Sequence, residues 1–451
     1  MPFSACVLAI CLFTASLFAT PTITVSQRET LLDEPITITL SGMPVKELIT
    51  FRATCTDMHD QEWSSHAVFE TNDTGEVDLT TQSPIEGSYE GADSMGLFWS
   101  ILPKEKLAQP FKMGDSAMPI RLVATCGEEY IAEATMVRLP MLPTVERREI
   151  REEELVGTLF FDKTMGPQPG IVVLGGADGG IYERMARWYA SHGFAAFALG
   201  YFGVDGLPSR QERIELTNVL RGIEWFKKQP EVLADHIAIH GTSKGGELAL
   251  LLGSFFPNAM QAIIACVPSM HIQPGGNCSA TPWLLHGSTT GLPHTAPCSS
   301  HEEYVEAARA GSLPRYKSTF DRPCQCSRFY LFDMKRFPEE HIAAEIPVEN
   351  IQCPLLITSG EDDHRWPSAH FGTLIMNRLE AKGSTINRTH LCYLGAGHYI
   401  PTAAYNPSSD HPEWWGEGLN CWLSAGGTAA ANAHAAADAR SAILAFLGKH
   451  L

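Results

Sequence analysis

Basic side chains are scarce in this 451-residue chain, which has 33 Lys and Arg against 51 Asp and Glu and a formal net charge of −18. A strongly acidic balance argues against non-specific binding to nucleic acid, because phosphate backbones attract basic proteins. It also means that any anionic substrate would need a local basic pocket. Internal repeats are absent, and 44% hydrophobic with 19% charged residues is typical of a globular protein.

The sequence also lacks a pattern that would hold a metal or a cofactor. Cys324-Gln325-Cys326 has no second ligand pair at the spacing of a zinc finger. The glycine loop at 175–180, Gly-Gly-Ala-Asp-Gly-Gly, matches no phosphate-binding fingerprint. We therefore predict neither a metal nor a cofactor.

The first twenty residues carry no charged side chain and are nearly all apolar or small. This run is short for a membrane span and ends in small residues around Ala19, which is typical of a cleaved secretory signal, although its start has no Lys or Arg. An uncleaved anchor or an apolar N-terminal strand is the alternative. We predict a signal peptide or apolar leader over 1–20, no membrane span once it is removed, and a secretory or extracellular location.

Sequons and cysteines agree with that route. Three glycosylation sequons begin at Asn72, Asn277 and Asn387. Two of the 12 cysteines lie in the leader, and the remaining ten are an even number. Cys55 and Cys126 could form a bridge, and further cysteines crowd one loop-rich segment at Cys278, Cys298, Cys324 and Cys326. The last three residues resemble a peroxisomal tail only poorly, and a peroxisomal or cytosolic location is the alternative.

The chain is too long for one ordinary core, so we expect two or three domains. From Pro21 to about Pro143, short runs of β-forming residues alternate with turn residues. This pattern predicts an N-terminal all-β sandwich of immunoglobulin-like size over 21–145, with a role in packing or substrate framing. A charged stretch at 146–154 marks the boundary of this domain.

Beyond that boundary, strands and helices alternate, which predicts a mostly parallel sheet covered on both faces. We expect strands at 170–174, 194–199, 237–239, 354–358 and 391–394, and helices at 182–192, 209–228 and 429–447. Between about 271 and 346 the periodicity fails and Gly, Pro and Cys accumulate. That segment is predicted to be an insertion over the carboxyl edge of the sheet, a candidate lid.

The most informative stretch runs from Ile237 to Leu250 and reads IAIHGTSKGGELAL. An apolar run, G-x-S-x-G and a helix-forming run, in this order, are typical of a nucleophile elbow, in which a tight turn lifts a serine above the sheet edge. Crowding in that turn requires residues without a Cβ at positions 241 and 245, and both are Gly. Ser243 is the candidate nucleophile, and a chance match in a glycine-rich loop is the alternative. The expected fold class is α/β, with an α/β-hydrolase domain over 146–451.

A serine hydroxyl needs an adjacent base, usually a histidine that a carboxylate orients. In α/β-hydrolases these residues follow in the order Ser, Asp or Glu, His. The acidic residues 361–363 directly follow one predicted strand, and His398 stands in a glycine-flanked loop after another. We predict His398 as base and Asp363 as the orienting acid. His364 is the rival base, and the residues alone do not choose among the three acids.

Backbone amides are expected to bind the developing oxyanion. The amide of Lys244 lies at the start of a helix, whose first N–H groups favour negative charge. The loop after an early strand supplies the second amide in this fold, which points to Gly176 or Ala177. The competing interpretation of that loop is a plain turn.

Several stretches resemble the acyl-CoA thioesterase / bile acid-CoA:amino acid N-acyltransferase family. They are GTSKGGEL at 241–248, GEDDHRW at 360–366, GHYI at 397–400, SMGLFWS at 94–100 and the segment 25–44. The resemblance covers nearly the whole chain after the leader. It implies a triad of Ser243, Asp363 and His398, which favours Asp363 over Asp362. Members with serine look like thioesterases, whereas the amino-acid conjugating members carry cysteine.

The resemblance therefore implies hydrolysis of fatty acyl-CoA to fatty acid and coenzyme A through an acyl-enzyme. Fatty acyl-CoA is the expected partner, with Lys227, Lys228 and Lys244 as candidate phosphate contacts. The alternatives are a secreted carboxylesterase with the same triad, an acyl-CoA:amino acid N-acyltransferase, and a lipid-binding relative whose triad no longer assembles. Acyl length and oligomeric state cannot be read from the sequence.

Overall fold

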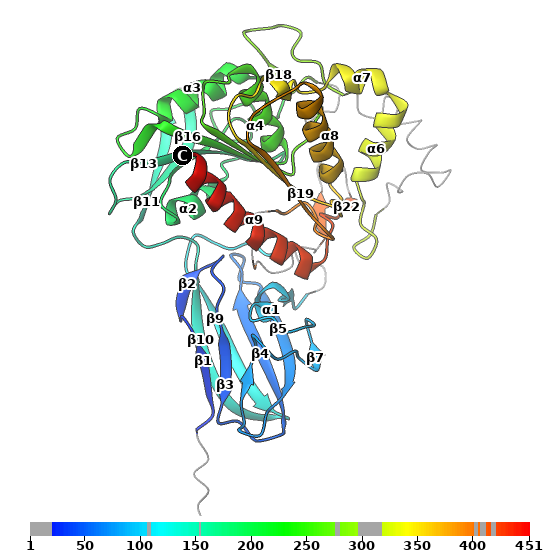
Figure 1. The fold of residues 1–451 in the computed structure, drawn as a ribbon. Coiled ribbons are helices and arrows are strands. Elements are labelled where there is room, and N and C mark those ends of the chain that lie inside the picture. Colours follow the sequence, from blue (N-terminus) through cyan, green and yellow to red (C-terminus); the bar gives the residue numbers. More distant parts are fainter. Residues whose placement is uncertain are drawn as a thin grey trace, which may run out of the picture.

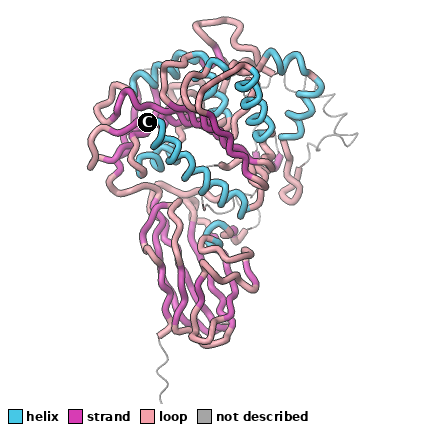
Figure 2. Tube along the Cα trace, viewed as in Figure 1, coloured by secondary structure: helices cyan, strands magenta, loops and turns pink. Residues whose placement is uncertain are grey.

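A computed structural model describes most of the chain. It covers residues 20–105, 110–152, 155–275, 280–295, 318–400, 405, 412–415 and 421–451. The predicted leader, apart from Thr20, lies outside these residues, as do Cys278, Cys298 and Asn277. The molecule has an elongated N-terminal part made of strands and a C-terminal part in which helices surround a sheet (Figures 1 and 2).

The N-terminal part consists of two sheets and one short helix, α1 (Gly96–Trp99). The smaller sheet contains β1 (Thr22–Val25), β3 (Ile38–Ser41) and β6 (Val77–Asp78). The larger sheet has the order β2-β10-β9-β4-β5-β7, and β8 pairs with β5. Its strands are β2 (Glu29–Leu31), β4 (Leu48–Thr56), β5 (Glu62–Glu70), β7 (Glu86–Gly87), β8 (Leu102–Pro103), β9 (Met118–Cys126) and β10 (Glu129–Leu139).

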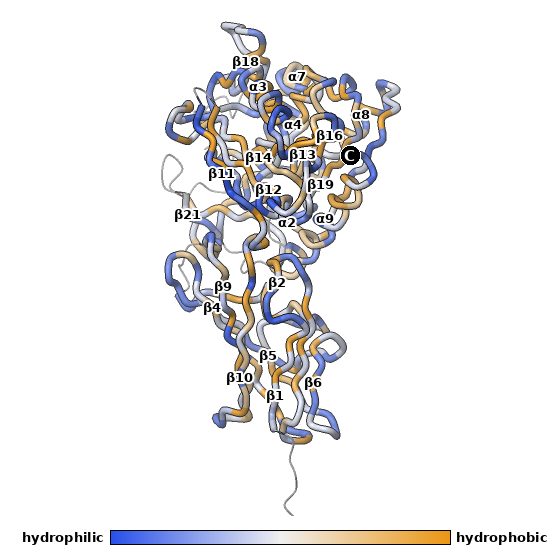
Figure 3. The backbone as a smooth tube through the Cα atoms, turned by 90° about the vertical axis from the view of Figure 1, so that its left-hand side faces the viewer, coloured by the Kyte–Doolittle hydropathy of each residue, from blue (hydrophilic) through white to orange (hydrophobic). Residues whose placement is uncertain are grey.

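One apolar core joins these two sheets. Ile38 of the smaller sheet and Phe51 and Leu122 of the larger one are fully buried in the same cluster. Buried and exposed residues alternate along β4 and β5, because successive side chains of a strand point to opposite faces. Hydrophobic and hydrophilic segments are interspersed along this part of the chain (Figure 3).

The C-terminal part is built on an eight-stranded sheet with the order β11-β12-β14-β13-β16-β17-β19-β20. β11 and β12 pair antiparallel, β12 runs antiparallel to β14, and the remaining pairs are parallel. The strands are β11 (Val145–Glu152), β12 (Leu155–Asp162), β13 (Gln168–Leu174), β14 (Ala195–Leu199), β16 (Val232–Thr242), β17 (Ala262–Cys266), β19 (Leu355–Gly360) and β20 (Arg388–Tyr393).

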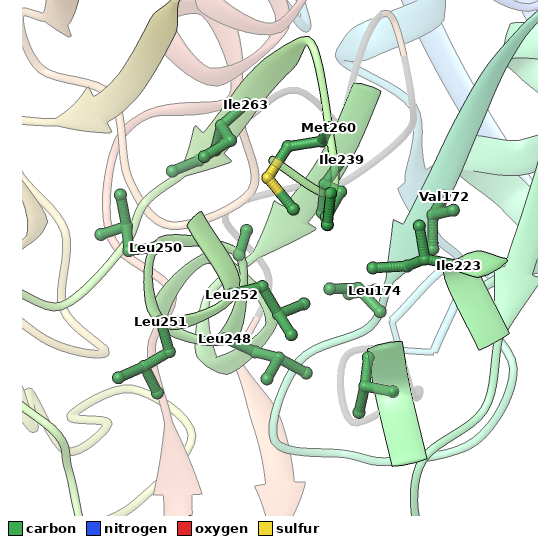
Figure 4. Close-up of a cluster of buried hydrophobic side chains, with 14 of the residues drawn as sticks. Val172, Leu174, Ile223, Ile239, Leu248, Leu250, Leu251, Leu252, Met260 and Ile263 are labelled. Carbon is green, nitrogen blue, oxygen red and sulfur yellow. The ribbon is translucent and has the colours of Figure 1, made fainter. Parts of the chain in front are cut away.

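Helices cover both faces of this sheet, as the alternation predicts. The side chains of β13 divide between two clusters, Val172 and Leu174 on one face and Ile171 and Val173 on the other. The first face packs against α3 (Leu216–Phe226), α4 (Lys244–Phe255) and α8 (Ser368–Ala381), and the leucines of α4 fill much of that core (Figure 4). The second face packs against α2 (Glu183–Ser191) and α9 (Ala429–His450). No helix in the described residues is long and apolar enough to cross a membrane.

Two element predictions were wrong in part. The helix expected from 209 begins only at Leu216, because residues 209–213 form bends, Arg213 has a φ of 55°, and β15 (Ile214–Glu215) pairs with β18 (Trp283–Leu284). The insertion, predicted without periodic structure, contains α6 (Ser327–Arg336) and α7 (Pro338–Ala343), followed by the 3-10 turn η1 (Val348–Asn350). α6 packs Tyr330 and Met334 against the core only in part, and Asp333 is its buried residue, so the helix gives a weak apolar pattern.

The predicted bridge between Cys55 and Cys126 is also wrong. The register of β4 on β9 pairs Cys126 with Ile49, at the opposite end of β4 from Cys55. Six residues of extended strand separate the two positions by about 20 Å, far beyond disulfide range. Both are free thiols, as are Cys324 and Cys326.

We expect the thiols to differ in reactivity according to burial. Cys392 is exposed, whereas Cys55 is buried and its pKa is raised to about 12, chiefly by desolvation. Iodoacetamide should alkylate Cys392 in the native protein, and Cys55 and Cys126 fully after denaturation without reductant. Peptide mass spectrometry provides the measurement. A disulfide-linked pair of peptides containing Cys55 and Cys126 would contradict the structure.

Candidate active site

Ser243 lies in the sharp turn between β16 and α4. Its backbone has a φ of 59° and a ψ of −119°, a conformation that costs free energy in a residue with a side chain. A Cβ on Gly241 would collide with the carbonyl of Gly245, and a Cβ on Gly245 would collide with the carbonyls of Leu174 and Gly175. The amide of Ser243 donates to the carbonyl of Cys266 on β17 at 2.9 Å, which ties the turn to the sheet.

Backbone amides gather beside Ser243. The amide of Glu247 donates to the carbonyl of Ser243 at 3.1 Å, so the amides of 244–246 precede the first hydrogen bond of α4. Gly176 lies against the serine, because a Cβ built there would stand 3.4 Å from Ser243 Cβ and 3.9 Å from its Oγ. The Tyr201 hydroxyl donates to the carbonyl of Gly175 at 2.6 Å and anchors this loop. Lys244 and Gly176 thus border the hydroxyl, while the neighbouring Ala177 is exposed.

Asp363 and His398 form a buried hydrogen-bonded pair. Nδ1 of His398 lies 2.8 Å from Oδ2 of Asp363. His398 is 7% exposed and Asp363 is 4% exposed. Oδ1 of Asp363 accepts from the amides of Arg365 at 2.9 Å and Trp366 at 3.3 Å, so both carboxylate oxygens are held. Because the N–H at Nδ1 donates to the carboxylate, Nε2 of His398 carries a lone pair and can accept a proton.

A chain of contacts brings this pair to the strand ends that carry Ser243. The indole of Trp366 donates to the carbonyl of Val267 at 2.9 Å, and its ring centroid lies 5.9 Å from that of His398. Val267 directly follows Cys266, whose carbonyl accepts from the amide of Ser243. The acid–base pair and the serine therefore share the carboxyl edge of the parallel strands, where open α/β sheets place their sites.

The rival residues have other partners. His364 uses both ring nitrogens, one towards Ser424 Oγ at 2.9 Å and the other towards Asp362 Oδ1 at 3.1 Å. Asp362 also accepts from the amide of Gly427 at 3.0 Å. The geometry therefore favours Asp363 and His398 over this second pair, which cross-links two loops.

Asn432, which the sequence analysis did not single out, supports the loop of His398. It is fully buried in the first turns of α9, where its Oδ1 accepts from the amide of Gly397 at 2.7 Å and its Nδ2 donates to the carbonyl of Gly426 at 3.1 Å. Its position within an Ala-rich run offered no motif. The amide of His398 itself donates to the carbonyl of Ala425 at 2.9 Å.

A buried ion pair lies directly behind the nucleophile. Lys244 Nζ lies 2.7 Å from Glu247 Oε1 and donates to the carbonyl of Gln273 at 2.8 Å, and the indole of Trp283 donates to the same carboxylate at 2.8 Å. Burial lowers the pKa of Lys244 and raises that of Glu247, while their attraction opposes both changes. The Lys244 side chain is thus occupied, which overturns it as a candidate phosphate contact. Lys227 pairs with Glu224 at 2.8 Å.

Charged side chains crowd the far side of His398. Arg365 forms an ion pair with Glu413 of β21 (Glu413–Trp415), which pairs with β22 (Cys421–Leu423), and Glu413 also accepts from the Tyr399 hydroxyl. The charges of this cluster act on Asp178 in the glycine loop. Desolvation and the charge of Glu413 raise the pKa of Asp178, while Arg365 and His398 oppose that change. The sequence patterns gave no sign of this cluster.

An eight-stranded α/β sheet with a serine in a strained strand–helix turn and an Asp–His pair at the same edge defines an α/β-hydrolase. Two family models match the chain, "Acyl-CoA thioester hydrolase/BAAT N-terminal region" at residues 33–152 and "BAAT / Acyl-CoA thioester hydrolase C terminal" at 214–451. The chain belongs to this acyl-CoA thioester hydrolase/BAAT family, as the resemblance of its motifs predicts.

Curated relatives span most of the chain. Acyl-coenzyme A thioesterase 2, mitochondrial, of Mus musculus is 30% identical over 93% of this chain and 87% of its own length. The bile acid-CoA:amino acid N-acyltransferase of Mus musculus is 28% identical over 82% of this chain and 84% of its own. Among solved structures, a dienelactone hydrolase-like promiscuous phosphotriesterase from metagenomic libraries matches 68% of this chain and 99% of its own, at 16% identity and a TM-score of 0.39.

The names of these relatives bear on the predicted location. One is called mitochondrial, and a further Mus musculus relative, 28% identical over 93% of this chain and 94% of its own, is a peroxisomal succinyl-coenzyme A thioesterase. The predicted secretory location therefore gains no support from the relatives.

Two Lys–Glu pairs with the same three-residue spacing provide a matched test of burial. Glu247→Gln should lower the free energy of unfolding by about 3–5 kcal/mol, because it leaves the buried Lys244 cation without its carboxylate. Glu224→Gln, at a carboxylate that is 49% exposed, should change it by less than about 1 kcal/mol. Urea unfolding followed by tryptophan fluorescence gives both values. Equal values for the two variants would refute the role assigned to the buried pair.

Proposed function

We propose that this protein hydrolyses fatty acyl-CoA thioesters to free fatty acid and coenzyme A, with Ser243 as nucleophile, His398 as base and Asp363 as the orienting acid. The observation that carries the proposal is the buried 2.8 Å hydrogen bond between Asp363 and His398 at the sheet edge where the strained Ser243 turn lies. Family membership supports the substrate class, because several of the relatives are named acyl-coenzyme A thioesterases.

The reaction follows from the positions of these groups. Ser243 Oγ attacks the thioester carbonyl carbon while His398 Nε2 takes the hydroxyl proton, and Asp363 stabilises the imidazolium. The oxyanion accepts hydrogen bonds from the amides of Lys244 and of Gly176 or Ala177. When the C–S bond breaks, the proton on His398 neutralises the coenzyme A thiolate. Water then attacks the acyl-serine while His398 accepts a proton from it, and His398 gives that proton to Ser243 Oγ as the fatty acid leaves.

Serine at position 243 favours hydrolysis over transfer to an amino acid. An acyl-serine is an oxygen ester that water attacks readily, whereas the thioester formed by a cysteine nucleophile favours amines. Transfer to glycine or taurine is the second candidate, since the relatives include an N-acyltransferase.

The predicted domains and lid belong to the same proposal. The chain divides into a β-sandwich of immunoglobulin-like size over 21–145 and a catalytic domain over 146–451, and the insertion at 271–346 acts as a lid. Contact between this insertion and the acid loop, through the amide of Ser327 and the carbonyl of His364 at 3.0 Å, supports the lid. Free thiols at the described cysteines favour the peroxisomal or cytosolic alternative over secretion, because disulfides form in oxidising compartments, and one relative is named peroxisomal.

Removal of the nucleophile tests the proposal directly. Ser243→Ala should lower kcat for palmitoyl-CoA by roughly 10³- to 10⁶-fold, since the acyl-enzyme cannot form. Release of coenzyme A is followed with a thiol reagent, and Ser209→Ala, at an exposed serine, serves as the control. Turnover like that of the wild type in Ser243→Ala protein of unchanged Tm would reject the triad.

A substrate panel separates the candidate activities. We expect release of free acid from acyl-CoA of some chain lengths, with no amide product when glycine or taurine is added. Mass spectrometry of the products distinguishes acid from amide, and an aryl ester is tested in parallel. Amide formation would assign the protein to the N-acyltransferases, and turnover of the aryl ester alone would assign it to the carboxylesterases.

A further inference from the structure

A small open cavity lies where the N-terminal part meets the C-terminal part. The β2 end of the N-terminal part faces α2 and α9 at this junction (Figure 1). The lining includes Asp33 from the N-terminal part, Arg184, Arg187 and Trp188 from α2, and Arg440 from α9. The cavity has a free volume of about 20 Å³, which leaves room for a small group and not for a whole cofactor.

Positive charge exceeds negative charge around this cavity. Asp33 is the acidic residue of the lining, and it is already engaged by the Trp188 indole at 2.6 Å, His192 at 3.4 Å and Arg440 at 3.6 Å. Arg187 pairs with Asp115 at 2.6 Å, but that carboxylate is 81% exposed and largely solvated. Among the residues that the structure describes, three arginines and one carboxylate therefore line the cavity.

Arg184 is the cation without a counterion. Among the described residues, its guanidinium makes no hydrogen bond or ion pair, and its Nε is shielded from solvent without a partner. Burial and the neighbouring charges of Arg440 and Arg187 lower the pKa of Arg184 to about 10. Arg184 is half-buried, so its guanidinium loses part of its hydration without gaining an anion, and a negatively charged group in the cavity would stabilise it.

We propose that this junction cavity, lined by Arg184, Arg187 and Arg440, is a binding site for a phosphate group. Guanidinium groups present forked donors that match the oxygens of phosphate, and three of them converge here from two helices. The site is a local basic pocket in a chain whose net charge is −18. The phosphate is either free inorganic phosphate or a phosphate of coenzyme A, and both use the same chemistry.

Thermal unfolding tests the site without reference to turnover. Millimolar inorganic phosphate should raise the Tm of the wild-type protein by about 3 °C relative to sodium chloride of the same ionic strength. Arg184→Gln should abolish that difference, and Arg52→Gln, at an exposed arginine on β4 of the N-terminal part, should retain it. Without phosphate, Arg184→Gln should unfold at the wild-type Tm or above, because it removes an uncompensated cation.

Coenzyme A and its 3′-dephospho form identify the source of the phosphate. Calorimetric binding of coenzyme A that weakens about tenfold in Arg184→Gln, and in the dephospho ligand, assigns the site to the coenzyme. Phosphate stabilisation without such weakening assigns it to the free anion. A wild-type protein that responds alike to phosphate and chloride, or an Arg184→Gln variant that responds as the wild type does, overturns the proposal. These measurements involve no catalysis, so they stand apart from failure of the thioesterase proposal.

Discussion

The turn at Ser243 is the constraint on which the rest of the site depends. A serine with a positive φ persists only because the chain on either side comes closer than a Cβ would allow, at Gly241 and Gly245. That close approach presses the start of α4 against the end of β13, which places Gly176 beside the hydroxyl and the first amides of α4 around it. One steric condition thus sets the nucleophile and the amides together.

The structure holds this turn from behind and surrounds it with loops from distant parts of the chain. The Lys244–Glu247 pair, capped by Trp283 and Gln273, ties the first turn of α4 to the insertion. Asn432 of α9 holds the loop of His398. Each support uses hydrogen bonds inside the protein, where an unpaired polar group costs more than in water, so the supports also make the site rigid.

Charge is distributed unevenly over the molecule. The chain is acidic as a whole, yet α2 and α9 direct three arginines to the junction with the N-terminal part. A negatively charged group at that junction would pair with arginines of the C-terminal part, while the N-terminal part contributes Asp33, which pairs with Arg440 across the junction.

Local sequence determined much of this protein. Runs of β-forming residues between turn residues predicted the N-terminal strands, and the alternation of strand and helix patterns predicted the helix-covered sheet. The motifs around Ser243, Asp363 and His398 selected the candidate residues, because turn sterics and strand–loop order are encoded in short stretches. Only the tertiary structure decided the pairings that join distant segments. It placed Cys55 and Cys126 at opposite ends of β4, gave His364 and the Lys244 side chain other partners, and brought Asn432 and Arg184 to their places. Such contacts depend on which elements pack together, and no periodicity within one segment encodes that.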